Sequence, residues 1–110
     1  YQAMLDLLAL PEPPTAMVMD GNVHGDGAVA ALQQAGRLSG SHPIALVMYD
    51  GMPQDSLTDI TVTAIEQATR EQVGEQIASM MQALIAGEAV ENLQVLWQPT
   101  LRLGKTSFPA

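Results

Sequence analysis

Apolar residues form two short, uninterrupted runs along the chain, and between these runs they recur at helical spacing. The two runs cover residues 15–19 and 44–49, and the stretch between them, residues 23–35, is rich in alanine and precedes Gly36. Uninterrupted apolar runs of strand length are typical of parallel strands buried on both faces, and glycine commonly ends a helix. The pattern therefore predicts a strand–helix–strand unit whose two strands are parallel and covered on both sides.

The other segments are predicted from patterns of the same kind. In chain order they are a helix over residues 1–10, a short strand over residues 60–65, a helix over residues 70–86, and one bent or two short strands over residues 93–103. Thr69 and Gln72 have the spacing of a capping box, which satisfies backbone groups at the start of the third helix. Asn22 is predicted to cap the second helix. This order of helices and strands is typical of the α/β class.

Length and charge limit the functions that are open to the chain. Its 110 residues allow one domain with a modest core. The formal net charge is −8, with four Lys and Arg residues in total, so the chain should repel phosphate backbones and not itself bind nucleic acid. No apolar run approaches membrane-spanning length, so no membrane partner is expected. Because the first residues already read as helix, we expect the chain to be part of a longer protein.

The residue types that carry catalysis or bind metals are not arranged for either role. His24 and His42 are the two histidines, the chain has no cysteine, and neither histidine lies in a metal-ligand spacing. The serines lie in predicted loops without the strand–turn–helix motif of a nucleophile. The glycine-rich stretch 21–27 matches neither the dinucleotide fingerprint nor a phosphate-binding loop, which needs a lysine. The sequence therefore predicts no enzyme, no catalytic residue, no metal site and no cofactor.

Two carboxylates are placed where the ligands of α/β proteins bind. Asp20 directly follows the first predicted strand, and Asp50 follows the second. In open α/β sheets, ligands occupy the crevice beyond the carboxyl ends of parallel strands. Two interpretations are open: each aspartate brackets the turn that follows its strand, or at least one accepts hydrogen bonds from the hydroxyl groups of a polyol ligand.

Several runs, in order along the chain, resemble motifs of the lactose/galactose repressor family. Residues 14–22, P-T-A-M-V-M-D-G-N, and then residues 27–36 resemble the family's P-T-A, four residues, N-D, and a helix ending in A-G. The further resemblances are residues 44–50, a strand ending in Y-D; residues 63–67, similar to T-T-[IV]-x-Q; residues 74–87, a long closing helix; and residues 101–107, similar to V-x-R-x-S-T. The resemblance covers essentially the whole chain.

The resemblance implies a three-layer, parallel-sheet, Rossmann-like lobe of a periplasmic-binding-protein-like type I fold. A protein of this family has two lobes, with a small effector in the cleft between them. Residues 1–110 would be the C-terminal lobe of the effector-binding and dimerisation domain, while the other lobe and a DNA-binding helix-turn-helix headpiece would lie upstream. DNA contact would then belong to the headpiece alone, in keeping with the acidic charge of this chain.

The resemblance also implies which residues contact the effector. The family's effector-binding aspartate falls on Asp50, and its glutamine falls on Gln67. The asparagine of N-D falls on Gly21, which has no side chain for binding, and the aspartate of N-D falls on Asn22. Asp20 or Asn22 would then supply the missing contact, or the ligand would differ from the usual sugar.

The resemblance further implies a homodimer, because in the family the helix after N-D and the loop after the Y-D strand help to form the subunit contact. The residues at that contact would be Val23, Asp26, Ala30, Met52 and Thr58. The implied function is the effector-sensing lobe of a cytoplasmic, sugar-responsive transcriptional repressor, in which a sugar or sugar derivative controls DNA binding by the headpiece. The alternative is the periplasmic sugar-binding protein of an ABC transporter, which shares the fold.

Overall fold

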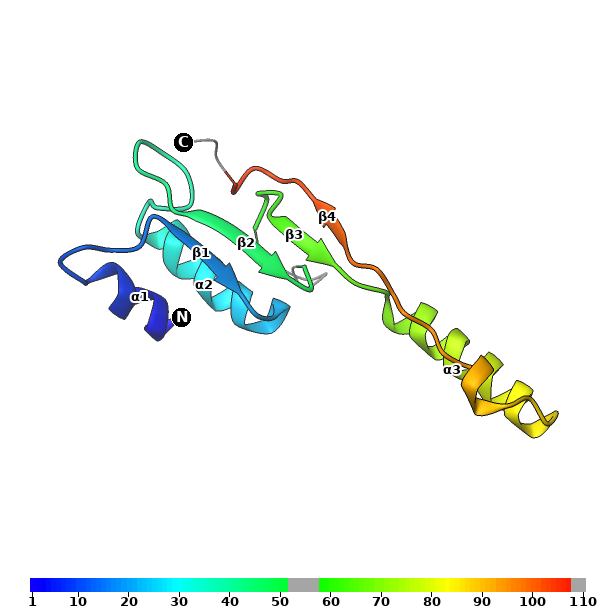
Figure 1. The fold of residues 1–110 in the computed structure, drawn as a ribbon. Helices are drawn as coiled ribbons and strands as arrows, with labels where there is room; N and C mark the ends of the chain where they lie inside the picture. The colour runs from blue at the N-terminus through cyan, green and yellow to red at the C-terminus, as the bar shows by residue number, and fades with distance from the viewer. Residues whose placement is uncertain (52–57, 108–110) are drawn as a thin grey trace. The chain divides into compact units, whose positions relative to one another are not determined.

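The computed structural model of the chain describes residues 1–51 and 58–107 (Figure 1). Along these residues the elements are α1 (Gln2–Leu8), β1 (Ala16–Met19), α2 (Asn22–Gln34), β2 (Ala45–Tyr49), β3 (Thr63–Glu66), α3 (Arg70–Ile85), the 3-10 turn η1 (Val90–Asn92) and β4 (Thr100–Arg102). This order confirms the predicted α/β class. Among the described helices, none is both long and apolar enough to cross a membrane.

Contacts within the chain divide it into two compact units. Unit 1 comprises Tyr1–Glu66 and Thr100–Ala110, and unit 2 comprises Gln67–Pro99. Unit 2 is inserted in the sequence between β3 and β4, and no residue of its long helix α3 is buried. The assignment of residues 1–110 to a single lobe remains a prediction.

The four strands of unit 1 form one sheet in the order β1-β2-β3-β4. β1 pairs with β2 in parallel, with Val18 opposite Val47, and β2 pairs with β3 in parallel, with Met48 opposite Ala64. β4 is antiparallel to β3. The parallel pairing predicted for the first two strands is confirmed, and the carboxyl ends of β1, β2 and β3 share one edge of the sheet.

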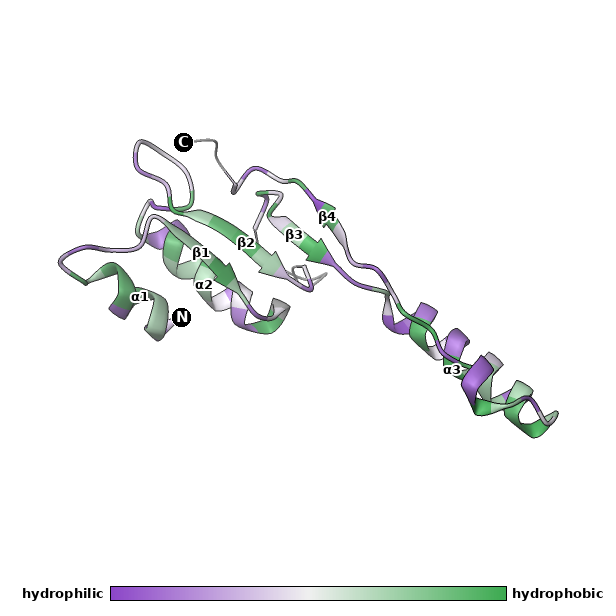
Figure 2. Cartoon of the chain, in the orientation of Figure 1, coloured by the Kyte–Doolittle hydropathy of each residue, from purple (hydrophilic) through white to green (hydrophobic). Residues whose placement is uncertain are grey.

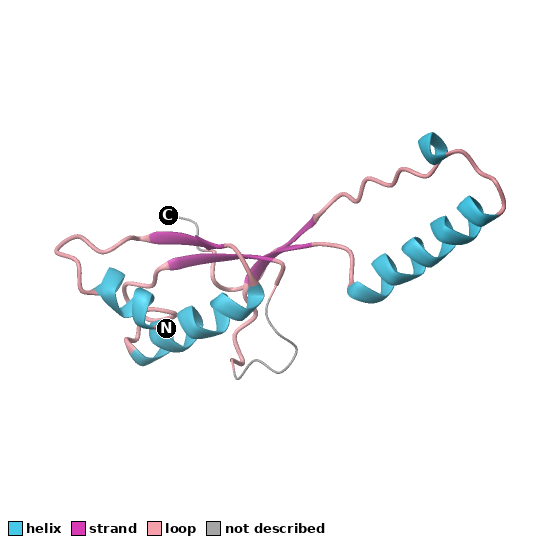
Figure 3. Ribbon diagram, turned by 90° about the horizontal axis from the view of Figure 1, so that it is seen from below, coloured by secondary structure: helices cyan, strands magenta, loops and turns pink. Residues whose placement is uncertain are grey.

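The helices of unit 1 cover one face of the sheet (Figure 3). Met17 and Met19 of β1 pack against the core on this face, whereas Val18, which points the other way, is 72% exposed. The buried apolar core consists of Met4, Ala28, Val29, Ala31, Leu32, Leu38, Ile44, Leu46, Met48, Val62 and Ala64. The expectation that both faces of β1 are covered is wrong for the described chain, because α1 and α2 lie on the same side.

Several predicted boundaries differ from the observed ones by one or more residues. β3 begins at Thr63 rather than at residue 60 and extends to Glu66. Of residues 93–103, only 100–102 form a strand, because the partner strand is short and Pro99, which has no N–H, lies at the limit of the ladder. α2 begins at Asn22, so Gly21 occupies the N-cap position and provides no side-chain hydrogen bond. Asn22 is therefore not the cap that the sequence predicted.

The segment after β4 is held to the sheet by buried hydroxyl groups. The Thr106 hydroxyl donates to the carbonyl of Leu46 at 2.7 Å and accepts from the backbone N–H of Thr63 at 3.0 Å. The Thr63 hydroxyl accepts from the N–H of Gly104 at 2.9 Å and lies 2.7 Å from the hydroxyl of Ser107. Thr63 and Thr106 are both buried. These bonds connect β2, β3 and the chain's closing segment.

The helix α3 of unit 2 begins with the predicted capping box. The Thr69 hydroxyl accepts from the N–H of Gln72 at 3.2 Å, and the Gln72 side chain accepts from the N–H of Thr69 at 2.8 Å. These two bonds satisfy backbone donors that a helix start otherwise leaves without partners. Both hydrogen bonds of the predicted capping box are confirmed.

We expect Thr69→Ala to destabilise α3 by about 1 kcal/mol, since the helix then loses its N-terminal hydroxyl acceptor. Hydrogen exchange at the amides of α3 measures this change directly. Thr69→Ser keeps the oxygen and should retain most of the protection. If the two variants lost the same amount of hydrogen-exchange protection, the methyl group of Thr69, rather than its hydroxyl, would stabilise the helix start.

α3 alternates hydrophilic and hydrophobic positions along its length (Figure 2), and none of its residues is buried among the described residues. Its exposed apolar residues are Val73, Ile77, Met81, Leu84 and Ile85. A helix in water normally turns such a stripe toward a core. Exposed apolar residues that gather on one element are typical of an interaction surface.

Candidate functional site

The carboxyl ends of the parallel strands bring the two predicted aspartates to one edge of the sheet. Asp20 follows the last residue of β1, and Asp50 follows the last residue of β2. Met19 is the register partner of Met48, so the two strands end at nearly the same level. Both aspartates are exposed. The predicted location of this pair is confirmed.

Asp50 is held at the strand end in an uncommon backbone conformation. Its φ is 72°, in the left-handed region, and among the described residues no other non-glycine residue has a positive φ. Gly51 follows with a φ of 71°, and the N–H of Asp50 donates to the carbonyl of Ile65 at 2.8 Å. Aspartate tolerates this region better than most residues. The turn thus fixes Asp50 against β3, and such an outlier often marks a functional position.

Asp20 contacts the first turn of α2. Its Oδ1 lies 3.2 Å from Nδ1 of His24, four residues later in the chain, and both side chains are mostly exposed. This contact gives Asp20 a local structural role, which is the first of the two interpretations above. An exposed pair of this kind leaves the other carboxylate oxygen open to solvent at the sheet edge.

The other two predicted effector-binding residues, Asn22 and Gln67, are located by their positions at the ends of secondary-structure elements. Asn22 is the first residue of α2, at the same edge as Asp20. Gln67 is exposed and follows Glu66, the last residue of β3, directly in the chain. Asp20, Asp50 and Asn22 are therefore brought together in unit 1, while Gln67 is the first residue of unit 2.

An ion pair at this edge was missed by sequence reasoning. Nε of Arg102 donates to Oε1 of Glu66, and both side chains are about half exposed. Glu66 ends β3 one register step beyond the pair formed by Tyr49 and Ile65. The opposite charges are 36 residues apart in sequence. Because the strand register that joins them is not local, the sequence carried no direct signal for the pair.

The residues predicted at a subunit contact have different surroundings. Val23 and Ala30 are exposed on α2, and Asp26 is half-buried. Thr58 accepts hydrogen bonds from Nε2 of Gln33 at 3.1 Å and from the N–H of Ile60 at 3.2 Å. The first of these bonds joins α2 to the end of the loop that follows β2. Met52 lies outside the described residues.

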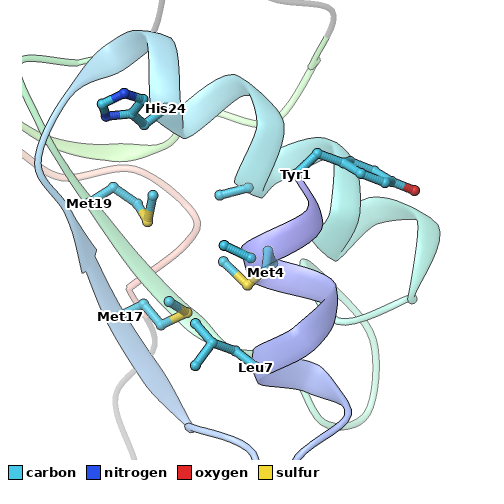
Figure 4. A pocket seen from close by; sticks show the side chains of 8 residues that line it. Tyr1, Met4, Leu7, Met17, Met19 and His24 are labelled. Carbon is cyan, nitrogen blue, oxygen red and sulfur yellow. The ribbon is translucent and has the colours of Figure 1, made fainter.

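A small apolar cavity of about 240 Å³ lies between α1, β1 and α2 (Figure 4). Its lining residues are Tyr1, Ala3, Met4, Leu7, Met17, Met19, His24 and Ala28. A sugar site needs several polar groups that converge on the ligand, and this lining is mostly aliphatic and thioether. The cavity is therefore a weaker candidate than the strand-end edge. In the part of the chain that the structure describes, no three His, Asp or Glu side chains are grouped to hold a metal ion.

Comparison with known proteins shows the family of the chain. Residues 1–101 match the model of the family described as "Periplasmic binding proteins and sugar binding domain of LacI family". The chain belongs to this family. The resemblance to the lactose/galactose repressors, first noted from short motifs, is thereby confirmed.

Two relatives of this LacI-family chain are transcriptional regulators by name. The HTH-type transcriptional regulator RafR of Escherichia coli is 47% identical over 106 residues, which are 96% of this chain and 32% of RafR. The HTH-type transcriptional regulator AglR of Rhizobium meliloti (strain 1021) is 29% identical over 115 residues, covering 100% of this chain and 31% of AglR. The chain thus spans about a third of the length of these relatives.

A solved structure agrees with this LacI-family fold. It is that of a protein from Yersinia pestis biovar Microtus str. 91001, provisionally described as a transcriptional regulator. The two chains are 52% identical and superpose with a TM-score of 0.87 over 97% of this chain and 38% of that one. The periplasmic-binding-protein-like α/β fold implied by the resemblance is confirmed.

Proposed function

We propose that the chain is the effector-sensing and dimerisation part of a sugar-responsive transcriptional regulator of the LacI family. The observation that carries this proposal is Asp50, held by a left-handed turn at the carboxyl edge of a parallel sheet in a relative of HTH-type regulators. The full protein would contact DNA through a headpiece outside these residues, act in the cytoplasm, and need no enzymatic activity.

The effector site would lie at the strand-end edge. Ionised carboxylates accept strong, directional hydrogen bonds from hydroxyl groups, so Asp50 and Asp20 suit a sugar or sugar derivative. Asn22 and Gln67 would add amide donors and acceptors. Gly21 offers no side chain where the family has asparagine, so Asp20 or Asn22 would supply that contact.

Control of DNA binding would follow from the two-lobed architecture of the family. An effector that contacts both lobes favours one angle between them, and this population shift changes the geometry of the headpieces across a dimer. The homodimer contact would use α2 and the loop after β2. Its residues would be Val23, Asp26, Ala30, Met52 and Thr58.

We propose, as the resemblance implies, that residues 1–110 belong to the C-terminal lobe of the effector-binding domain, with the effector's sheet edge in unit 1. The apolar stripe of α3 in unit 2 needs a partner, because no described residue buries it. We therefore infer that this stripe packs on a part of the protein outside the 110 residues. The relatives, about three times longer, have room for such a partner.

The first experiment is calorimetric titration of the full-length protein with a panel of neutral sugars and sugar phosphates. We expect saturable binding of at least one compound and a loss of about 10- to 100-fold in affinity for Asp50→Ala, since hydrogen bonds to a charged group are strong. Asp6→Ala is the matched control, because Asp6 is an exposed carboxylate on α1 that contacts Gln2. Absence of binding across the panel would contradict the sugar proposal.

The alternative, a periplasmic sugar-binding protein of a transporter, shares the family and the strand-end aspartate. Both named relatives are HTH-type regulators, and this observation favours the regulator. The sequence upstream separates the two: a helix-turn-helix would support the regulator, and a secretory signal peptide would support the transporter protein.

A further inference from the structure

The two points at which the chain passes between unit 1 and unit 2 are neighbours on the sheet. The chain leaves unit 1 after Glu66 and re-enters it at Thr100. These two residues are register partners in the antiparallel pair of β3 and β4. Both covalent connections between the units therefore start from this two-strand junction.

The backbone pairing at the junction is short and exposed. Three register pairs join β3 to β4, and all three residues of β4 are exposed. Further along the chain, Thr106 is joined to Thr63 by a buried hydrogen bond and Gly104 by a partly buried one. β4 is thus firmly held on the side of the closing segment, whereas no buried contact holds its other end among the described residues. A short edge ladder of this kind opens readily at its free end.

The Glu66–Arg102 ion pair spans this weak end. Arg102 is the register partner of Ala64, and Glu66 lies two residues further along the same strand. Side chains two residues apart on a strand share a face, so the ion pair is a diagonal cross-strand contact. It connects the held end of β4 with the last residue of β3 before the junction.

We propose that the Glu66–Arg102 pair is a clasp that fixes the point at which the chain passes between the two units. With the clasp closed, β3 and β4 stay paired as far as Thr100, and Gln67 begins directly at the sheet edge. With the clasp open, the ladder frays from Glu66 and Thr100, and both connections to unit 2 lengthen. Glu66 and Arg102 are positioning residues in this proposal, which does not depend on the identity of an effector.

The magnitude of the effect follows from the exposure of the pair. Both side chains are about half exposed, so solvent and salt screen their attraction, and the global stability of the protein should barely change. The local opening of the β3–β4 ladder is more sensitive to loss of the ion pair than the global stability is. The reason is that few other contacts hold the free end of this ladder. The clasp should therefore be visible in local exchange and weakened by salt.

The test is amide hydrogen exchange on the full-length protein. We expect Arg102→Gln and Glu66→Gln each to raise exchange at the amides that face across the β3–β4 pair, those of Ala64, Glu66, Thr100 and Arg102, by about two- to fivefold. The amides of Leu46 and Thr63, which report the buried network, should stay unchanged. In about 1 M NaCl the wild type should approach the variants, and the variants should change little further.

Two controls make the outcome specific to the charge pair. Glu88→Gln removes an exposed carboxylate that accepts a hydrogen bond from Asn92 within unit 2, and it should leave the ladder unchanged. The charge-swapped double variant, Glu66→Arg with Arg102→Glu, should restore slow exchange. The proposal is overturned by unchanged exchange in Arg102→Gln, by a lack of rescue in the double variant, or by an equal rise at Leu46 and Thr63.

Discussion

Gly104→Ala is expected to destabilise unit 1 by about 3 kcal/mol or to prevent its folding. A Cβ on Gly104 would lie 2.5 Å from the carbonyl carbon of Val62 and 2.7 Å from the nitrogen of Thr63, and closer still to the carbonyl oxygen of Thr61. These are backbone atoms at the start of β3, so no side-chain rotation relieves the overlap. The N–H of Gly104 also donates to the Thr63 hydroxyl, and a backbone shift would break this bond.

Thermal and denaturant unfolding of the full-length protein measure the effect, with exchange at β2 and β3 amides to locate it. Gly74→Ala is the matched control, because nothing lies within 4 Å of a Cβ at this position of α3. Glycine inside a helix costs about 1 kcal/mol relative to alanine, so this change should stabilise α3. The same substitution is thus expected to act in opposite directions at the two sites. An unchanged melting temperature for Gly104→Ala would contradict the close approach.

The features predicted correctly from the sequence are those that depend on neighbouring residues. The helix over 70–86 was predictable because Thr69 and Gln72 are three residues apart, and the capping box needs nothing else. The strands ending before Asp20 and Asp50 were predictable because an uninterrupted apolar run of four to six residues fits a buried strand. The shared edge then followed from parallel pairing alone.

The features that the sequence did not predict depend on contacts between distant segments. The strand β3 begins at Thr63, where its pairing with β2 begins opposite Val47, and Thr63 also bonds to Thr106 and Ser107, which lie more than 40 residues away. The Glu66–Arg102 pair depends on the register of β3 and β4. The left-handed turn at Asp50 depends on its bond to Ile65. Periodicity says nothing about such pairings, nor does it say whether an apolar stripe such as that of α3 is covered.

The second large effect is expected for Thr106→Val, which should destabilise unit 1 by about 3 kcal/mol. Valine has nearly the shape of threonine, so the packing is retained while the hydroxyl is lost. The Thr106 hydroxyl serves two buried backbone groups: it donates to the carbonyl of Leu46 and accepts from the N–H of Thr63. Both groups would be left without this partner, and an unsatisfied buried group costs about 1–3 kcal/mol.

Thr106→Ser separates the hydroxyl from the methyl group at this position. Serine keeps both hydrogen bonds and loses one buried methyl, so its cost should be about 1 kcal/mol. Denaturant unfolding of the three proteins side by side gives the comparison, and faster exchange at the Thr63 amide in Thr106→Val alone would locate the loss. If valine left the stability unchanged while serine lowered it, packing rather than hydrogen bonding would hold the closing segment. If the hydrogen bonds hold it, as we expect, β4 loses its firm end in Thr106→Val, and fraying of the β3–β4 ladder should extend past Arg102 toward Gly104 in that variant.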